Sequence, residues 1–116
     1  MKIGELAERT GVSVRSLRYY ETRQLITSDR TSGGQRVYRA DAIERVLLVQ
    51  QLFRAGLGSA DVVKLLPCIY SGTTTVEMVL LIEREHARLD AQIRDLIETR
   101  DRLEEVRIAA AERLAA

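Results

Sequence analysis

Apolar residues recur at helical spacing along most of the chain. Ile3 and Leu6 share one helical face, and Gly11 follows where a left-handed residue would end a helix. Ser13 is a residue type that caps helix N-termini, so a second helix is predicted from residue 14 to about residue 23. Two short helices joined by a turn that contains glycine predict a helix-turn-helix.

The segment 27–38 is rich in turn formers and ends on an extended, partly apolar run. Gly33 and Gly34 between two short extended pieces predict a β-hairpin. A hairpin that follows a helix-turn-helix is called a wing. We therefore expect residues 1–75 to form a winged helix-turn-helix domain.

Two further helices are predicted to complete this domain. Asp41 and Glu44 have the spacing of a capping box and open an apolar helix through Phe53, which Gly56 and Gly58 end.

Ser59 then caps a shorter helix over 60–66, which Pro67 stops. The segment 68–75 is predicted to be a loop.

A stretch from residue 76 to about residue 113 contains no proline or glycine and predicts one helix about 55 Å long. Its apolar stripe advances in alternating steps of three and four, which is a heptad seam. The seam positions are Val79, Ile82, His86, Leu89, Ile93, Leu96, Arg100 and Leu103. Such a helix needs a partner, so we expect residues 76–116 to be a dimerisation element that forms an antiparallel coiled coil with a second copy. The expected fold is mainly α.

Charge is distributed unevenly, although the net charge is only +1. The first 39 residues hold eight Lys and Arg residues against four Asp and Glu residues, and the remainder is acidic. The preference for arginine over lysine in this part suits planar, bidentate contacts to phosphate and base edges. The basic end therefore points to nucleic acid.

The second predicted helix places Val14 and Leu17 on its buried side. The candidate DNA-binding residues on or beside the opposite side are Arg15, Ser16, Arg18, Tyr19 and Tyr20. Those in the wing are Arg30, Arg36, Tyr38 and Arg39. Guanidinium, hydroxyl and phenol groups suit base edges and phosphate oxygens. The alternative is a solvated face with packed tyrosines, but a basic wing beside a helix-turn-helix favours DNA binding.

Three runs carry a specific resemblance: IGELAERTGVS at 3–13, LRYYE at 17–21 and GGQRVY at 33–38. They resemble the signature of MerR-type transcription regulators, here in a short form. The resemblance implies a homodimer that binds a palindromic promoter operator, one winged helix-turn-helix to each half. It also implies that the dimer kinks and untwists the DNA so that RNA polymerase engages both promoter elements.

By position, the resemblance implies that Arg15 contacts a base edge and that Arg18 and Tyr20 contact the DNA backbone. It makes Arg30, Arg36 and Tyr38 the wing contacts.

Two positions depart from that family pattern. Gln24 stands where a glycine usually follows the recognition helix, which implies strain or an altered turn. Gln35, a further candidate DNA contact, stands where an aromatic residue is common.

The single cysteine, Cys68, excludes an intramolecular disulfide and suggests a reducing compartment. Cys68 is either a small packed residue or a redox or electrophile sensor. With His86 alone it would make an incomplete metal site, so we expect no metal and no cofactor. His86 is expected to be packed or hydrogen-bonded between chains in the seam.

We expect a transcription regulator in the cytoplasm with no membrane association, since no signal peptide or apolar span is present. An architectural or excisionase-like DNA-binding protein is the alternative, which the long dimerisation helix disfavours. No catalytic triad, phosphate loop or metal cluster is evident, so we do not expect an enzyme.

Overall fold

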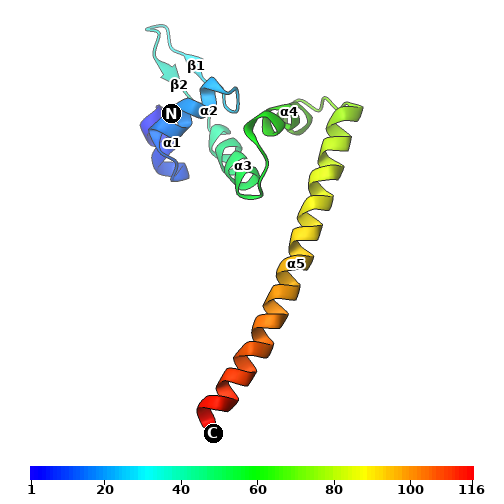
Figure 1. Cartoon of the computed structure of the whole chain (residues 1–116). Coiled ribbons are helices and arrows are strands. Elements are labelled where there is room, and N and C mark those ends of the chain that lie inside the picture. Colours follow the sequence, from blue (N-terminus) through cyan, green and yellow to red (C-terminus); the bar gives the residue numbers. More distant parts are fainter. The chain divides into compact units, whose positions relative to one another are not determined.

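The computed structural model describes residues 1–116 as five helices and one hairpin (Figure 1). The elements are α1 (Ile3–Thr10), α2 (Val14–Thr22), β1 (Asp29–Arg30), β2 (Arg36–Val37), α3 (Ala42–Arg54), α4 (Ser59–Tyr70) and α5 (Val76–Ala115). The chain divides into two compact units, Met1–Met78 and Val79–Ala116. The predicted fold class, a mainly helical winged helix-turn-helix followed by a long helix, is confirmed.

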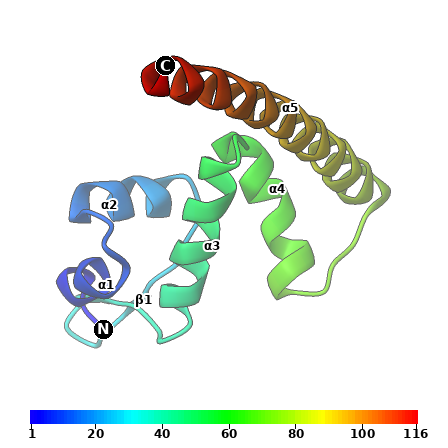
Figure 2. The ribbon, with the colours of Figure 1, turned by 90° about the horizontal axis from the view of Figure 1, so that it is seen from below.

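The helix-turn-helix forms from the local signals that predicted it. Gly11 has a φ of 72°, and its amide donates to the Ala7 carbonyl at 2.9 Å, which ends α1. The Ser13 hydroxyl accepts from the Ser16 amide at 3.1 Å and caps α2. Helix α1 packs on both α2 and α3 (Figure 2). The core of this unit includes the fully buried side chains Leu6, Leu17, Leu25, Ile26, Val46, Val49 and Val62.

Helix α2 ends in a Schellman motif built on Gln24. The Leu25 amide donates to the Tyr20 carbonyl at 2.8 Å, and the Gln24 amide donates to the Glu21 carbonyl at 3.0 Å. This geometry needs a left-handed residue, and Gln24 takes a φ of 63° although it is not glycine. The strain expected from the departure at this position is therefore present.

The hairpin has the predicted location. Asp29 pairs with Val37 and Arg30 pairs with Arg36 in an antiparallel ladder. The Gly34 amide closes the turn by donating to the Thr31 carbonyl at 2.9 Å. Gly34 has a φ of 80°, which a residue with a Cβ would adopt only with strain.

The predicted capping box at the start of α3 is wrong. Asp41 already has a helical backbone conformation and makes no side-chain cap bond. A residue whose side chain caps a helix normally has an extended backbone, from which the side chain reaches the amides of the first turn. Here the Ala42 amide donates to the Arg39 carbonyl instead.

Helix α4 corrects three further predictions. Gly58 is the extended residue before the helix, so Ser59 is the first helical residue and not its cap. The helix runs through Pro67 to Tyr70, and the Ser71 amide still donates to the Pro67 carbonyl at 2.9 Å. The cation–π contact of Arg45 over the Tyr70 ring, at 4.5 Å, helps to hold the last turn.

Cys68 consequently lies in helix α4 and not in a loop.

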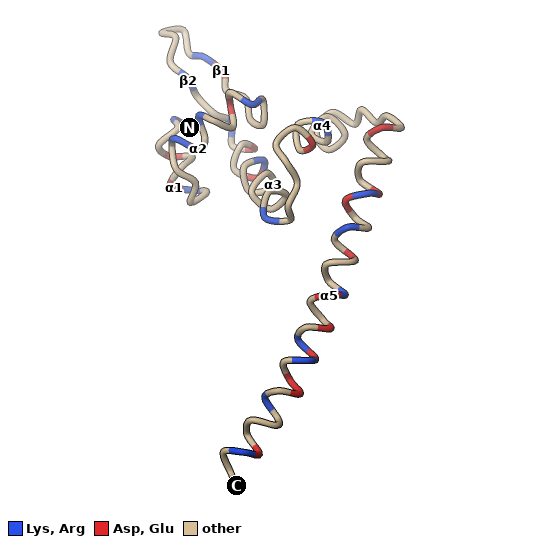
Figure 3. The backbone as a smooth tube through the Cα atoms, viewed as in Figure 1, with Lys and Arg blue, Asp and Glu red and all other residues tan.

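Helix α5 comprises 40 residues, close to the predicted length. Basic and acidic residues alternate along it (Figure 3). None of the helices is long and apolar enough to span a membrane.

Candidate nucleic-acid interface

The outer face of α2 presents the side chains expected to meet a DNA groove. Arg15 and Arg18 are exposed, and Tyr19 is 51% exposed. Ser16 is half-buried, and its hydroxyl accepts from the Ser13 hydroxyl at 3.0 Å. The face therefore offers two guanidinium groups and a phenol to a ligand.

Tyr20 does not belong to that face. Its side chain is 5% exposed, its ring meets Phe53 edge-on with centroids 5.7 Å apart, and its hydroxyl accepts from the Gln50 amide group. Helix α3 thus covers most of Tyr20 in the single chain, and the expected contact of Tyr20 with the DNA backbone stays a prediction.

Tyr38 is also a core residue, only 3% exposed. Its backbone pairs with Met1: the terminal ammonium donates to the Tyr38 carbonyl at 2.8 Å, and the Tyr38 amide donates to the Met1 carbonyl at 2.6 Å. Burial, and next the nearby Glu21 carboxylate, raise the pKa of Tyr38. Tyr38 therefore fixes the end of the wing, and its expected contact with DNA stays a prediction.

Each wing arginine has an acceptor within the protein. The Arg30 guanidinium donates to the Gly34 carbonyl at 2.9 Å, inside the hairpin. Arg39 pairs with Asp29 at 3.1 Å, and both side chains are well exposed. These contacts hold the charges on the surface of the hairpin, where a phosphate could compete for them.

Glu21 connects the end of α2 to the wing. Its carboxylate lies 3.2 Å from the Arg36 guanidinium and accepts from the Ser28 hydroxyl. The Glu21 side chain is 17% exposed, whereas that of Arg36 is 52% exposed. The pair thus sets the position of the Arg36 guanidinium relative to α2 and leaves half of it accessible.

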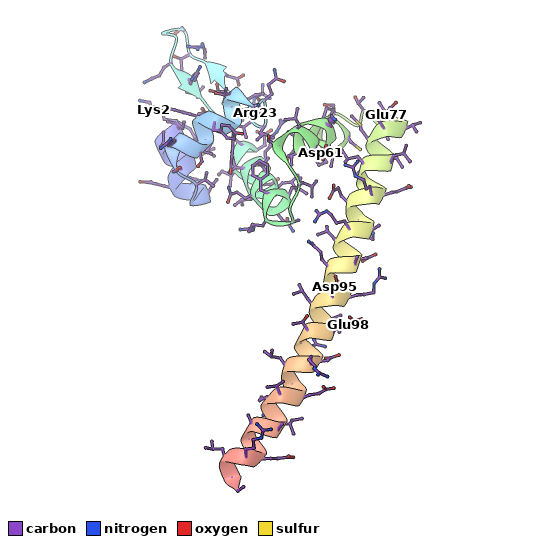
Figure 4. All side chains as sticks on the ribbon, in the orientation of Figure 1. Lys2, Arg23, Asp61, Glu77, Asp95 and Glu98 are labelled. Carbon is purple, nitrogen blue, oxygen red and sulfur yellow. The ribbon has the colours of Figure 1, made fainter.

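A cleft of about 290 Å³ lies between the N-terminus, α2 and the wing. It is lined by Lys2, Ile3, Arg18, Gln35, Arg36 and Tyr38. The structure thus brings together four predicted residues, Arg18 of α2 and Gln35, Arg36 and Tyr38 of the wing, and adds the cation Lys2. Figure 4 labels Lys2 near the N-terminus. The sequence could not reveal Lys2, because its place in the cleft depends on how the N-terminus meets the wing.

The remaining titratable candidates are scattered. No group of three or more His, Cys, Asp or Glu residues is placed to hold a metal ion. Cys68 is half-buried, with its Sγ 3.6 Å from the Thr74 hydroxyl. The His86 side chain is 77% exposed and lies 3.6 Å from the Asp90 carboxylate.

The predicted seam lies along α5, and most of it is exposed in the single chain. Exposed apolar members are Val79, Ile82, Ile93, Leu96 and Leu103. Leu89 is half-buried.

Two short helices followed by a small hairpin, with cationic side chains between the second helix and the hairpin, define the winged helix-turn-helix class of DNA-binding proteins. Residues 1–68 match the family described as MerR HTH family regulatory protein. The chain belongs to the MerR family of transcription regulators.

Relatives of known identity agree with this membership. The nodulation protein NolA of Bradyrhizobium elkanii is 36% identical over 106 residues, which cover 90% of this chain and 46% of NolA. The chain thus spans less than half the length of that relative. The CueR regulator of Yersinia pestis is 30% identical over 109 residues, which cover 89% of this chain and 76% of CueR.

Among solved structures, HiNmlR is described as a MerR family regulator lacking the sensor domain, bound to promoter DNA. It is 27% identical, with a TM-score of 0.74 over 89% of this chain and 83% of HiNmlR.

Proposed function

We propose that the protein binds a palindromic operator in promoter DNA as a homodimer and regulates transcription by distorting that DNA. In this proposal RNA polymerase is the partner that reads the distorted promoter. The observation that carries the proposal is the cleft where Lys2, Arg18 and Arg36 meet beside the exposed face of α2.

The cleft suits a backbone phosphate. Three cationic side chains line it together with the Gln35 amide, and no carboxylate lines it. A phosphate bound there would be contacted from α2, the wing and the N-terminus at once, which would fix the protein on the duplex.

With that phosphate bound, α2 would lie against the major groove. Arg15 lies towards the start of α2, one turn before Arg18, and is exposed. Residues near the start of a recognition helix are those that reach base edges, so we assign base reading to Arg15 and phosphate contact to Arg18. Tyr19 adds an exposed phenol on the same face.

The wing would contact the flanking backbone through Arg30, Arg36 and Arg39. To bind DNA, each guanidinium would leave its acceptor within the protein and bond phosphate oxygens instead. Few further side chains would then have to become ordered on binding. The description of HiNmlR as bound to promoter DNA supports promoter DNA as the ligand.

The test is a nuclease footprint of the purified protein on the DNA that flanks its own gene. We expect one protected segment with two-fold symmetric sequence and enhanced cleavage at its centre, where the DNA is distorted. Cooperative coating that spreads with protein concentration would instead indicate an architectural DNA-binding protein. The same titration with Arg18→Ala should need a higher protein concentration for the same protection, whereas Lys64→Ala on α4, the matched control, should protect as the wild type does.

A further inference from the structure

Helix α3 lies between α2 and α4 in the DNA-binding unit (Figure 2). One of its side chains, the half-buried Arg45, contacts the ends of both neighbouring helices. The Arg45 Nε donates to the Leu25 carbonyl at 3.2 Å, and its guanidinium carbon lies 4.5 Å from the centre of the Tyr70 ring. A single side chain thus joins the turn that follows α2 to the last residue of α4.

The contact with Leu25 fixes Arg45 relative to α2. The Leu25 side chain is 0% exposed, and the Leu25 amide donates to the Tyr20 carbonyl at 2.8 Å to close α2. The residue that ends α2 through its amide therefore receives Arg45 through its carbonyl. The guanidinium is held in place beside the helix that presents Arg15 and Arg18.

The last turn of α4 has fewer constraints of its own. Leu66 is 2% exposed, whereas Ile69 and Tyr70 are 50% and 43% exposed, so burial decreases along the final turn. Pro67 has no amide, so one helical hydrogen bond is missing immediately before that turn. The stacking of Arg45 on the Tyr70 ring therefore contributes to the direction in which α4 ends.

The direction in which α4 ends determines where the chain leaves the DNA-binding unit. Helix α4 ends at Tyr70 and α5 begins at Val76, so only residues 71–75 connect them. A tilt of the last turn would move the start of this short connection relative to α2. In a homodimer joined through α5, the separation of the two α2 helices would depend on two such turns.

We propose that Arg45 is a positioning residue that fixes the spacing of half-sites that the protein accepts in its operator. The inference rests on the proposed homodimer and palindromic operator, and it names a residue that acts on both without touching DNA. One added base pair moves a half-site by about 3.4 Å along the duplex and turns it by roughly 35°. A protein whose two α2 helices are held at one separation rejects such a duplex.

The test compares the operator with two duplexes whose half-sites lie one base pair closer together or further apart. Fluorescence titration gives the ratio of the affinity for the operator to the affinity for each altered duplex. For the wild type this spacing ratio should be at least roughly ten. Tyr70→Leu, which removes the ring beneath the guanidinium, should lower it to about three or less. Tyr70→Phe is the matched control, because it keeps the ring and should keep the wild-type ratio.

Arg45→Met tests the other side of the same contact. It should lower the spacing ratio as Tyr70→Leu does, and the double variant should have no larger effect than either single change, because both act through one contact. Tyr70→Leu should also bind a duplex with a single half-site within about twofold of wild type, since Arg15 and Arg18 remain in place. A purely structural role of the contact would instead weaken binding to that duplex as well.

The possible outcomes separate this inference from the proposed function. If Tyr70→Leu weakens binding to all duplexes equally and keeps the wild-type spacing ratio, Arg45 does not set the spacing and the inference is wrong. A loss of the ratio in Tyr70→Phe would also overturn it, because the hydroxyl and not the stacked ring would then be responsible. A wild type that binds all three duplexes equally would contradict the palindromic operator of the proposed function itself.

Discussion

At the scale of single residues, the arginines expected to contact DNA fall into two groups. Those in the wing are held by acceptors of the protein, as Arg36 is by Glu21 and Arg39 by Asp29. Those of α2, Arg15 and Arg18, project from an exposed helix face. The first group is positioned before DNA arrives, which lowers the conformational entropy lost on binding.

We expect Arg15→Ala and Arg18→Ala to affect binding in different ways. Arg15→Ala should relax preference at one symmetric base pair in each half-site, by roughly 1–3 kcal/mol, because a bidentate contact to guanine is lost. Arg18→Ala should weaken binding to all sequences alike. Selection of binding sites from random DNA with both variants measures this. The reverse outcome would show that the two roles are exchanged.

Lys2→Ala should lower the salt dependence of DNA binding. Loss of one phosphate contact per chain reduces the slope of log K against log salt by roughly 0.9, and two chains on the operator would double this. Binding measured at several salt concentrations gives the slope. Lys64→Ala, an exposed lysine on α4, should keep the wild-type slope; an unchanged slope for Lys2→Ala would remove Lys2 from the interface.

The sequence predicted the exposed side chains of α2, but it did not predict the burial of Tyr20 and Tyr38. A helical wheel gives the direction of a side chain relative to its own helix and not what another helix places there. Tyr20 flanks the buried stripe, and only the packing of α3 through Phe53 and Gln50 decides that it is covered. Tyr38 is likewise buried by contacts distant in the chain.

At the scale of elements, the ends of α2 and α3 offer a comparison. Both end in the same hydrogen-bond pattern around a left-handed residue, which is Gln24 after α2 and Gly56 after α3. A residue with a Cβ costs about 1 kcal/mol in this conformation. The recognition helix thus ends in a strained turn, whereas α3 does not.

Gln24→Gly should therefore stabilise the protein by roughly 0.5–1 kcal/mol, since the strain relieved exceeds the added flexibility of the unfolded chain. Chemical denaturation of wild type and variant gives the difference in free energy of unfolding. Gly56→Ala should act in the opposite direction. A destabilised Gln24→Gly would mean that the Gln24 side chain makes a contact that outweighs the strain.

The ends of helices were predicted correctly where a single residue determines them. The predictions were wrong where tertiary contacts determine the helix end. Gly11 and Ser13 act through bonds to residues three or four positions away, which a sequence displays. Ser59 accepts from the distant Arg23 at 3.1 Å. Pro67 lies within α4, and the burial of the neighbouring Leu65 and Leu66 stabilises that helix.

At the scale of the whole molecule, the long helix was the most predictable element, because its seam repeats over many turns. The sequence predicted that this helix needs a partner but did not identify the partner, since a single sequence shows an apolar stripe and not what covers it. The DNA-binding unit was predictable as a winged helix-turn-helix. Its cationic cleft was not, because Lys2, Arg18 and Arg36 come from separate segments.

Leu89→Asp combined with Ile93→Asp should convert the homodimer to monomers, since unpaired charges would lie in the centre of the seam. The variant should keep a folded unit over Met1–Met78, because both substitutions lie outside that compact unit. Sedimentation at micromolar concentration gives the mass, and circular dichroism reports the retained helices. A variant that remains dimeric would place the interface elsewhere.

The measurement that tests the central claim most directly is the binding of wild-type protein to the footprinted operator and to the same duplex with one half-site scrambled. Fluorescence titration gives the affinities, and sedimentation of the complexes gives the number of chains on each duplex. Two winged units held by one seam predict two chains on the intact operator and an affinity at least roughly a hundredfold weaker for the scrambled duplex. Equal affinities with one chain bound to either duplex would contradict a dimeric reader of a palindrome.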